Sequence, residues 1–182
     1  MNINWTDSTQ RFDPNSPDPF ATHGIPLPVY GNYGGPNWSA GQVDGKITGN
    51  PLIDPAPVDD LDQLFFTHDF AYQGHPDPIH NPGDLVARIQ ADIALVQGMH
   101  NLTFTDPGQP NYDPEAGLYE GLSTLGILGQ LAAFGIHLPN QQDLVQEAVV
   151  NFEAGLEAVP GEAKSLHGAF HVFEHQFSDF LL

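Results

Sequence analysis

Two short segments of the chain carry residues whose types and spacing could do chemistry. The first, residues 30–37, reads YGNYGGPN. Glycine adopts positive φ without penalty and asparagine tolerates it, so such a loop can turn several backbone carbonyls toward one point. Carbonyl oxygens suit a hard cation such as calcium, which takes roughly six to eight oxygen ligands and usually includes a carboxylate. The loop therefore predicts part of a calcium site.

The second segment, residues 67–72, reads THDFAY and places a titratable base beside a carboxylate. Pro57, followed by acidic residues, favours the start of a helix that contains this segment. Apolar residues recur at helical spacing on the face that carries His68 and Tyr72; they are Leu61, Leu64 and Phe65. Asp69 lies about 100° around the helix from His68. We therefore expect His68 to face a water molecule and Asp69 to face a metal.

A third element is a helix predicted to begin at Gly83, in which Asp92 falls within an apolar stripe. A carboxylate on a buried face is costly unless it is paired, and His68 is the natural partner. Such a pair would fix the tautomer of the imidazole and stabilise the imidazolium that forms when His68 takes a proton. Tyr72, one turn beyond His68, could donate its hydroxyl to the same carboxylate.

Simpler interpretations remain open for each of these elements. Asp92 could pair with Arg88, four residues earlier on the same helix, and Arg88 could instead pair with Asp84. A His-Asp dipeptide is common, and a loop of Gly, Asn and Pro is usually only a turn. The loop, the helix and the inward carboxylate in this order favour a catalytic site.

These motifs together resemble the secreted phospholipase A2 superfamily, whose calcium loop reads roughly Y-G-x-Y-x-G-x-G and whose helix reads H-D-x-x-Y. The resemblance covers roughly residues 29–99. It implies calcium-dependent hydrolysis of the sn-2 acyl ester of glycerophospholipids at a membrane surface or micelle. It also implies the calcium ligands, which are the backbone carbonyls of Tyr33, Gly35 and Asn37 and the carboxylate of Asp69.

The same resemblance implies how the reaction is catalysed. His68 is the general base that activates water, and Asp92 orients it. Tyr72 supports this pair, and the backbone N–H of Gly35 helps to hold the oxyanion. No serine nucleophile is indicated, because Ser39 has no G-x-S-x-G context.

Two departures from the family pattern concern the loop and the cysteines. Asn37 stands where the family has its last loop glycine. The chain has no cysteine, whereas the animal and plant enzymes contain many disulfides. The closer likeness is the cysteine-free branch, which includes parvovirus capsid enzymes and bacterial phospholipases A2. The Y-x-G-P-G loop of the parvovirus enzymes is similar to residues 33–37.

The composition of the chain limits which binding partners are expected. Lys and Arg number 4 against 23 Asp and Glu, giving a formal net charge of −19 among 182 residues. Such a charge argues against nucleic acid and against electrostatic attraction to anionic lipid, so membrane contact must be apolar or calcium-mediated.

The first ten residues lack the features of a signal peptide. The scarcity of basic residues and the final DFLL resemble bacterial proteins exported by type I systems. We expect secretion without a cleaved signal, with a cytoplasmic location as the alternative.

The expected fold is mainly α, with two antiparallel catalytic helices and a calcium loop followed by a C-terminal helical bundle. We divide the chain into an irregular proline-rich segment (1–28), a catalytic core (29–100), a turn-rich linker (101–115) and a C-terminal helical region (116–182). Residues 117–138 favour a buried helix over a membrane span. A second helix is expected over 141–158.

A last helix is predicted over residues 161–181, with a stripe of phenylalanines that could dock on lipid or belong to the core. His167, His171 and His175 follow at four-residue steps beside it. They could share a metal or form a solvated face.

Two rival functions remain open beside the enzyme. One is a non-catalytic calcium-dependent lipid-binding or toxin module, and the other is an acidic structural or adhesion protein that calcium stabilises. A binding module would need only the loop and Asp69. The joint presence of His68, Tyr72 and Asp92 favours the enzyme.

Overall fold

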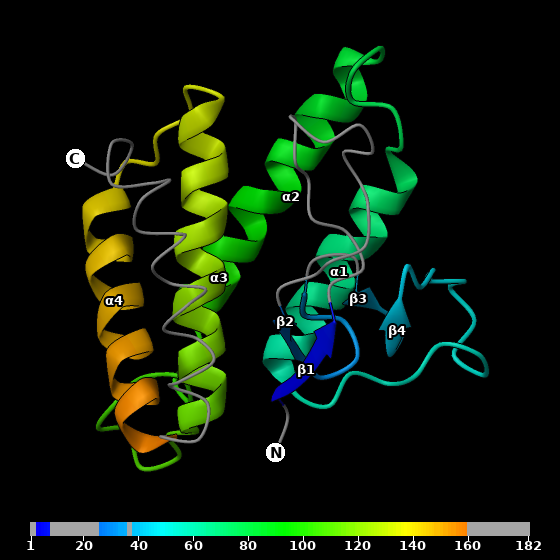
Figure 1. Ribbon diagram of the computed structural model, residues 1–182. Helices are drawn as coiled ribbons and strands as arrows, with labels where there is room; N and C mark the ends of the chain where they lie inside the picture. Colours follow the sequence, from blue (N-terminus) through cyan, green and yellow to red (C-terminus); the bar gives the residue numbers. More distant parts are fainter. Residues whose placement is uncertain (1–2, 8–25, 36–37, 160–182) are drawn as a thin grey trace.

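Helices dominate the described part of the protein (Figure 1). The computed structural model describes residues 3–7, 26–35 and 38–159. Strand β1 (Ile3–Asp7) pairs antiparallel with β2 (Pro26–Tyr30), and β3 (Trp38–Ser39) pairs antiparallel with β4 (Gln42–Val43). The helices are α1 (Asp60–Gly74), α2 (Pro82–His100), α3 (Pro114–Ala133) and α4 (Gln141–Ala158). The prediction of a mainly α fold is confirmed.

Helices α1 and α2 pack against each other and run antiparallel (Figure 1). Near the middle of both helices, His68 bonds to Asp92. Where the chain passes from one to the other, His75 bonds to Asp84. At the opposite end, a Cβ added to Gly98 would lie 2.6 Å from the side chain of Leu64, so a glycine is needed there for close approach.

Helix α1 begins three residues later than the position of Pro57 predicts. Its N-cap is Asp59, whose side chain accepts a hydrogen bond from the backbone N–H of Asp62 at 2.9 Å. Val58, the residue before this N-cap, lies outside the helix. Its backbone N–H donates to the Asp62 carboxylate at 3.0 Å. Helix α2 begins one residue before Gly83, at Pro82, after the N-cap Asn81. Residues 141–158 form α4, as predicted.

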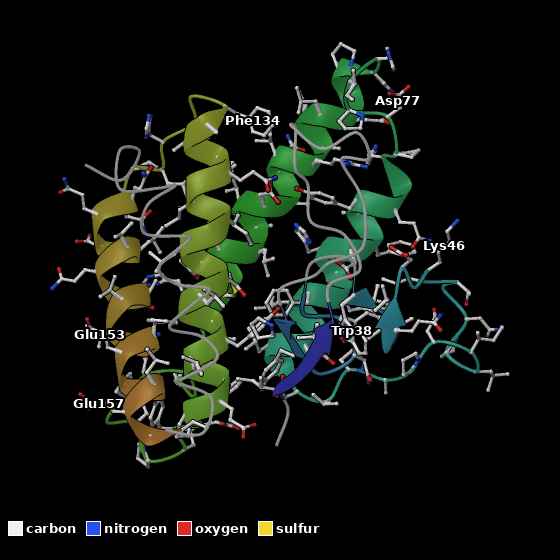
Figure 2. All side chains as sticks on the ribbon, viewed as in Figure 1. Trp38, Lys46, Asp77, Phe134, Glu153 and Glu157 are labelled. Carbon is white, nitrogen blue, oxygen red and sulfur yellow. The ribbon has the colours of Figure 1, made fainter. Side chains whose placement is uncertain are left out.

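Glycines on facing sides allow α3 and α4 to approach closely. A Cβ on Gly121 would lie 2.3 Å from the carbonyl oxygen of Ala148, and one on Gly155 would lie 2.6 Å from Leu118. The buried helix predicted over residues 117–138 is present as α3, which begins at Pro114 and ends at Ala133, so residues 134–138 lie beyond it. Figure 2 shows Glu153 and Glu157 on the outer side of α4, facing away from α3.

One hydrophobic core joins residues of all four helices with strands β1 and β2. Tyr119 of α3 stacks on Tyr30 of β2, with ring centroids 5.4 Å apart, and meets Phe65 of α1 edge-on at 5.5 Å. Because α3 contacts both β2 and α1, the core crosses the linker predicted at 101–115. The domain boundaries themselves remain a prediction.

The prediction of an irregular segment over residues 1–28 is wrong where β1 and the start of β2 lie. Ile3 pairs with Tyr30 across a long stretch of chain and is only 3% exposed. Local composition cannot indicate such a partner, because pairing depends on which distant strand is brought alongside. The helix predicted over 161–181, with His167, His171 and His175, lies outside the described residues.

None of the helices within residues 3–159 that the structure describes has both the length and the apolar character needed to cross a bilayer.

A buried acid between α3 and α4 gives a test of this packing. Glu120 is 2% exposed and accepts hydrogen bonds from Thr124 at 2.9 Å and from Asn151 at 2.8 Å. Burial raises the pKa of Glu120 above its ordinary value, although these two bonds partly oppose the shift. Its contribution to folding is therefore most favourable below the unfolded-state pKa and is lost as pH rises through the folded-state pKa.

We predict that Glu120→Gln raises the melting temperature more at pH 8 than at pH 5. The uncharged amide can accept from Asn151 through its oxygen and donate from its N–H₂ to the Thr124 hydroxyl. Each 1 kcal/mol gained would appear as about 2–4 °C in a thermal melt of a chain of this size. Glu153→Gln, on the exposed face of α4, is the control and should change little at either pH. An equal shift for Glu120→Gln at both pH values would contradict the prediction.

Candidate active site

A buried carboxylate brings His68 and Tyr72 of α1 together with α2. Asp92 is 2% exposed. Its Oδ1 lies 2.8 Å from His68 Nε2 and accepts the hydroxyl of Tyr72 at 2.7 Å. The pairing of Asp92 with His68 that the sequence predicts is therefore present, and so is the contact of Tyr72 with the same carboxylate.

The alternative pairing of Asp92 with Arg88 is wrong. Arg88 instead donates from Nε to the carbonyl of His75 at 2.7 Å, at the C-terminal end of α1. Its guanidinium carbon lies 4.8 Å from the centroid of the Tyr72 ring. Asp84 is occupied by His75, Asn81 and the backbone N–H of Asp77. Arg88 therefore supports the end of α1 and the Tyr72 ring.

The two ring nitrogens of His68 face two different carboxylates. A hydrogen bond to Asp92 requires the proton on Nε2, which leaves a lone pair on Nδ1 in the neutral ring. Nδ1 lies 3.5 Å from Oδ1 of Asp69. Burial lowers the pKa of His68, but the bonds to Asp69 and Asp92 outweigh it and raise the pKa above its usual value. The site therefore stabilises an imidazolium at this position.

Tyr72 acts in this network as a hydrogen-bond donor. Burial is the largest influence on its hydroxyl and, with Asp92, raises the pKa of Tyr72 well above the usual range. The phenol consequently stays protonated at neutral pH and holds Oδ1 of Asp92.

The glycine-rich loop is fixed by an acid that the sequence analysis does not assign to the site. Asp62 is fully buried, and its carboxylate accepts the backbone N–H groups of Asn32 at 2.9 Å, Tyr33 at 2.8 Å and Val58 at 3.0 Å. Gly31 has φ +55°, and a Cβ there would lie 2.5 Å from the Asp62 carboxyl carbon. Only glycine fits at position 31.

The sequence signal for Asp62 is weak. It stands three residues after the N-cap Asp59, where an acid is ordinarily explained by the helix dipole. Nothing local indicates that its side chain crosses to a loop 29 residues earlier in the chain. Burial raises the pKa of Asp62, and the loop N–H groups partly offset this.

Asp69 has a carboxylate oxygen that a calcium ion could use as a ligand. One oxygen of this carboxylate, Oδ2, is buried and has no hydrogen-bond partner among them. The Gly35 carbonyl accepts the N–H of Trp38 at 3.2 Å, which leaves one lone pair. No described residue donates to the Tyr33 carbonyl. Asn37 lies outside the described residues.

Side chains alone do not form a metal cluster here. Within the part of the chain that the structure describes, no three His, Asp or Glu side chains gather as a metal site. Calcium at Asp69 would therefore depend on backbone carbonyls and water for its other ligands, as the glycine-rich loop predicts.

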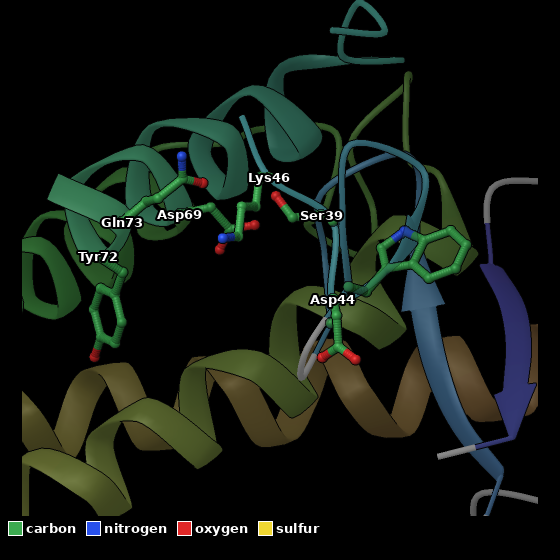
Figure 3. Close-up of a pocket in the computed structure, with 9 residues that line it drawn as sticks. Ser39, Asp44, Lys46, Asp69, Tyr72 and Gln73 are labelled. Carbon is green, nitrogen blue, oxygen red and sulfur yellow. The ribbon is translucent and has the colours of Figure 1, made fainter. Parts of the chain in front are cut away.

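A cavity of about 430 Å³ opens beside Asp69 and Tyr72 (Figure 3). Residues of α1 line one side of it, and residues around the β3–β4 hairpin line the other. The lining residues are Gly35, Trp38, Ser39, Asp44, Gly45, Lys46, Asp69, Tyr72 and Gln73. His68 is not among them, but its neighbour Asp69 and Tyr72, one turn further along α1, are.

The side of the cavity formed by the β3–β4 hairpin is anchored to α1 and contains residues with positive φ. Gln73 both accepts from the N–H of Ile47, at 2.9 Å, and donates to its carbonyl, at 2.7 Å. Ala40 and Asp44 adopt positive φ values of 51° and 54°, which are uncommon for residues other than glycine. The hydroxyl of Ser39 is buried there without a partner among the described residues. Such strain often accompanies functional sites.

Comparison of the chain with protein-family models, with curated proteins and with solved structures finds no match.

The role of Asp62 can be tested by a single-atom change. Asp62→Asn replaces one acceptor oxygen with an N–H₂ group that faces backbone donors, so we predict a loss of about 2 kcal/mol in the free energy of unfolding. Asp60→Asn, an exposed acid in the same helical turn, is the control. Amide hydrogen exchange at Asn32 and Tyr33 should accelerate in Asp62→Asn. Unchanged exchange at both amides would mean that the loop does not depend on this carboxylate.

Proposed function

We propose that the protein is a calcium-dependent hydrolase of the phospholipase A2 type, which cleaves the sn-2 acyl ester of glycerophospholipids. The observation that carries the proposal is the orientation of His68. Its Nε2 is held by the buried carboxylate of Asp92, and its Nδ1 faces Asp69, whose second oxygen has no partner among the described residues. A histidine, the carboxylate that holds it and an unused carboxylate oxygen thus lie together on α1 and α2, and Asp69, which carries that oxygen, lines the cavity.

In the proposed reaction, His68 Nδ1 takes a proton from a water molecule whose oxygen attacks the ester carbonyl. The tetrahedral intermediate carries the negative charge on the former carbonyl oxygen. On collapse, the bond to the glycerol oxygen breaks and the His68 imidazolium returns its proton to that oxygen, giving a fatty acid and a lysolipid. Asp92 stabilises the imidazolium between these two transfers.

The Gly35 N–H is the proposed donor to the oxyanion. It lines the cavity, and no described residue accepts a hydrogen bond from it. Gly35 has φ +151°, and a Cβ there would lie 2.7 Å from Val29, so the loop requires glycine at this position. When bound at Asp69 and the loop carbonyls, calcium would supply positive charge that polarises the ester and stabilises the oxyanion.

A lipid surface is the proposed partner. Leu52 is 92% exposed and Ile53 is 66% exposed, at a turn that Asp54 holds by accepting the N–H groups of Thr48 and Gly49. Ordered apolar side chains that project into solvent suit contact with lipid. The net charge of −19 is opposite in sign to that needed for nucleic acid.

The rival function, a calcium-dependent lipid-binding or toxin module without turnover, accounts less well for these contacts. Lipid binding through calcium would use Asp69 and the loop. It would not need a histidine oriented by a buried carboxylate and a tyrosine hydroxyl. Lipid binding with no release of fatty acid from any phospholipid would support this rival against the proposal.

The base and the metal ligand can be separated by two substitutions. His68→Gln should lower fatty-acid release from mixed phospholipid vesicles by about 10²-fold, the usual contribution of a general base, and keep the calcium-induced rise in melting temperature. Asp69→Asn should remove most of that rise and most of the activity. His80→Gln, an exposed histidine in the connection between α1 and α2, is the control for general effects of the change.

Activity close to that of the wild type in His68→Gln would exclude His68 as the base. A full calcium-induced shift in Asp69→Asn would exclude Asp69 as the ligand.

A further inference from the structure

We infer that Gln130 of α3 is a positioning residue of the active site, which holds Asp92 and Tyr72 in the orientation that fixes His68. The inference rests on the proposed function for its kinetic consequences. The phospholipase resemblance, over residues 29–99, does not reach Gln130. No feature of the sequence marks it out among the polar residues of α3.

Both hydrogens of the Gln130 amide are used at the site. Nε2 lies 3.1 Å from the hydroxyl oxygen of Tyr72 and 3.1 Å from Oδ2 of Asp92. Because an amide N–H₂ has two hydrogens, one group can serve both acceptors. The Tyr72 hydroxyl in turn donates to Oδ1 of Asp92 at 2.7 Å. Gln130, Tyr72 and Asp92 thereby close a ring of hydrogen bonds in which each donor has a defined acceptor.

This ring controls how the carboxylate is turned. His68 and Tyr72 both bind Oδ1 of Asp92, whereas Gln130 is the sole donor to Oδ2 among the described residues. Without that donor, one oxygen of a 2% exposed carboxylate would have no partner in this part of the chain. Hydrogen bonds to charged groups are strong, so losing this one would leave the carboxylate free to turn and would weaken its bond to His68 Nε2.

A neutral donor suits this position better than a charged side chain. Lysine or arginine would neutralise Asp92 and so reduce its ability to stabilise the His68 imidazolium. A carboxylate would repel Asp92 and could not donate while ionised. Glutamine fixes the geometry and leaves the charge of Asp92 available to His68.

The surrounding fold makes Gln130 both well placed and replaceable. Its neighbours Leu128 and Leu131 are each 1% exposed and anchor α3 in the core. Gln130 itself is exposed to solvent, although its amide reaches Tyr72 and Asp92. Substitution there removes the two hydrogen bonds and leaves the core intact. The C-terminal helical region thus contributes directly to the network around the base.

The kinetic test compares Gln130→Met, which has similar length and no donor, with Gln142→Met on the exposed face of α4. On dispersed short-chain phospholipid, Gln130→Met should lower kcat by about 10-fold and change KM by less than about 2-fold. Its calcium-induced shift in melting temperature should match that of the wild type. Gln130→Glu should lower kcat further than Gln130→Met.

The order of the kcat values of Gln130→Met and Gln130→Glu distinguishes a positioning role of Gln130 from a packing role. A role in packing alone would make the near-isosteric Gln130→Glu the milder change. Wild-type kcat in Gln130→Met, or a milder effect of Gln130→Glu, would overturn the inference.

A second readout does not depend on hydrolysis. In ¹⁵N-edited NMR of the full chain, wild-type His68 should show the Nε2–H tautomer, with a slowly exchanging proton. Gln130→Met should give faster exchange and a mixture of tautomers, and Gln142→Met should not. If the wild-type protein releases no fatty acid, the proposed function fails and this spectrum still decides the role of Gln130. An unchanged His68 signal in Gln130→Met would overturn it.

Discussion

The site depends on one buried carboxylate that three helices share. Asp92, on α2, takes His68 and Tyr72 from α1 and Gln130 from α3. A carboxylate at this depth is tolerated only because each oxygen has a donor. The bond from His68 to Asp92 also determines that Nδ1, and not Nε2, is the ring nitrogen on the side of Asp69. The hydrogen bonds that offset the cost of burying the Asp92 charge therefore also orient His68, the proposed base. They form only when the three helices are placed as observed.

A second buried carboxylate fixes the other half of the site. Asp62, near the start of α1, receives the N–H groups of the glycine-rich loop. Helix α1 thus carries the loop anchor at one end and the proposed base, His68, nearly two turns later. The distance from loop to base is consequently set by a single rigid helix. Burying these two carboxylates has a desolvation cost that their hydrogen-bond donors offset, and the resulting contacts hold the loop and His68 in place.

The parts of this arrangement that the sequence predicts are those encoded by local spacing. The face of α1 with Leu61, Phe65 and His68, and the inward position of Asp92, follow from helical periodicity and from the cost of an unpaired buried charge. The span of α4 follows from periodicity as well. Glycine-rich composition predicts a buried α3, since small residues permit close helix contact.

The parts that the sequence does not predict depend on contacts between distant segments. Asp62 is an ordinary helix-start acid until the loop is brought over it, and Gln130 is an ordinary surface glutamine until α3 lies across α1 and α2. The pairing of β1 with β2 likewise requires a partner that local composition does not indicate. Periodicity shows which face of a helix is buried, and tertiary packing decides which partner it meets.

The rate of fatty-acid release by Asp92→Asn at saturating calcium tests most directly whether Asp92 orients His68 for catalysis. The asparagine keeps the shape of the side chain but can present an N–H₂ group to Nε2, which favours the wrong imidazole tautomer and removes the charge that stabilises the imidazolium. The account predicts a fall in kcat of about 10²-fold or more, with calcium binding retained. Wild-type kcat in Asp92→Asn would contradict it.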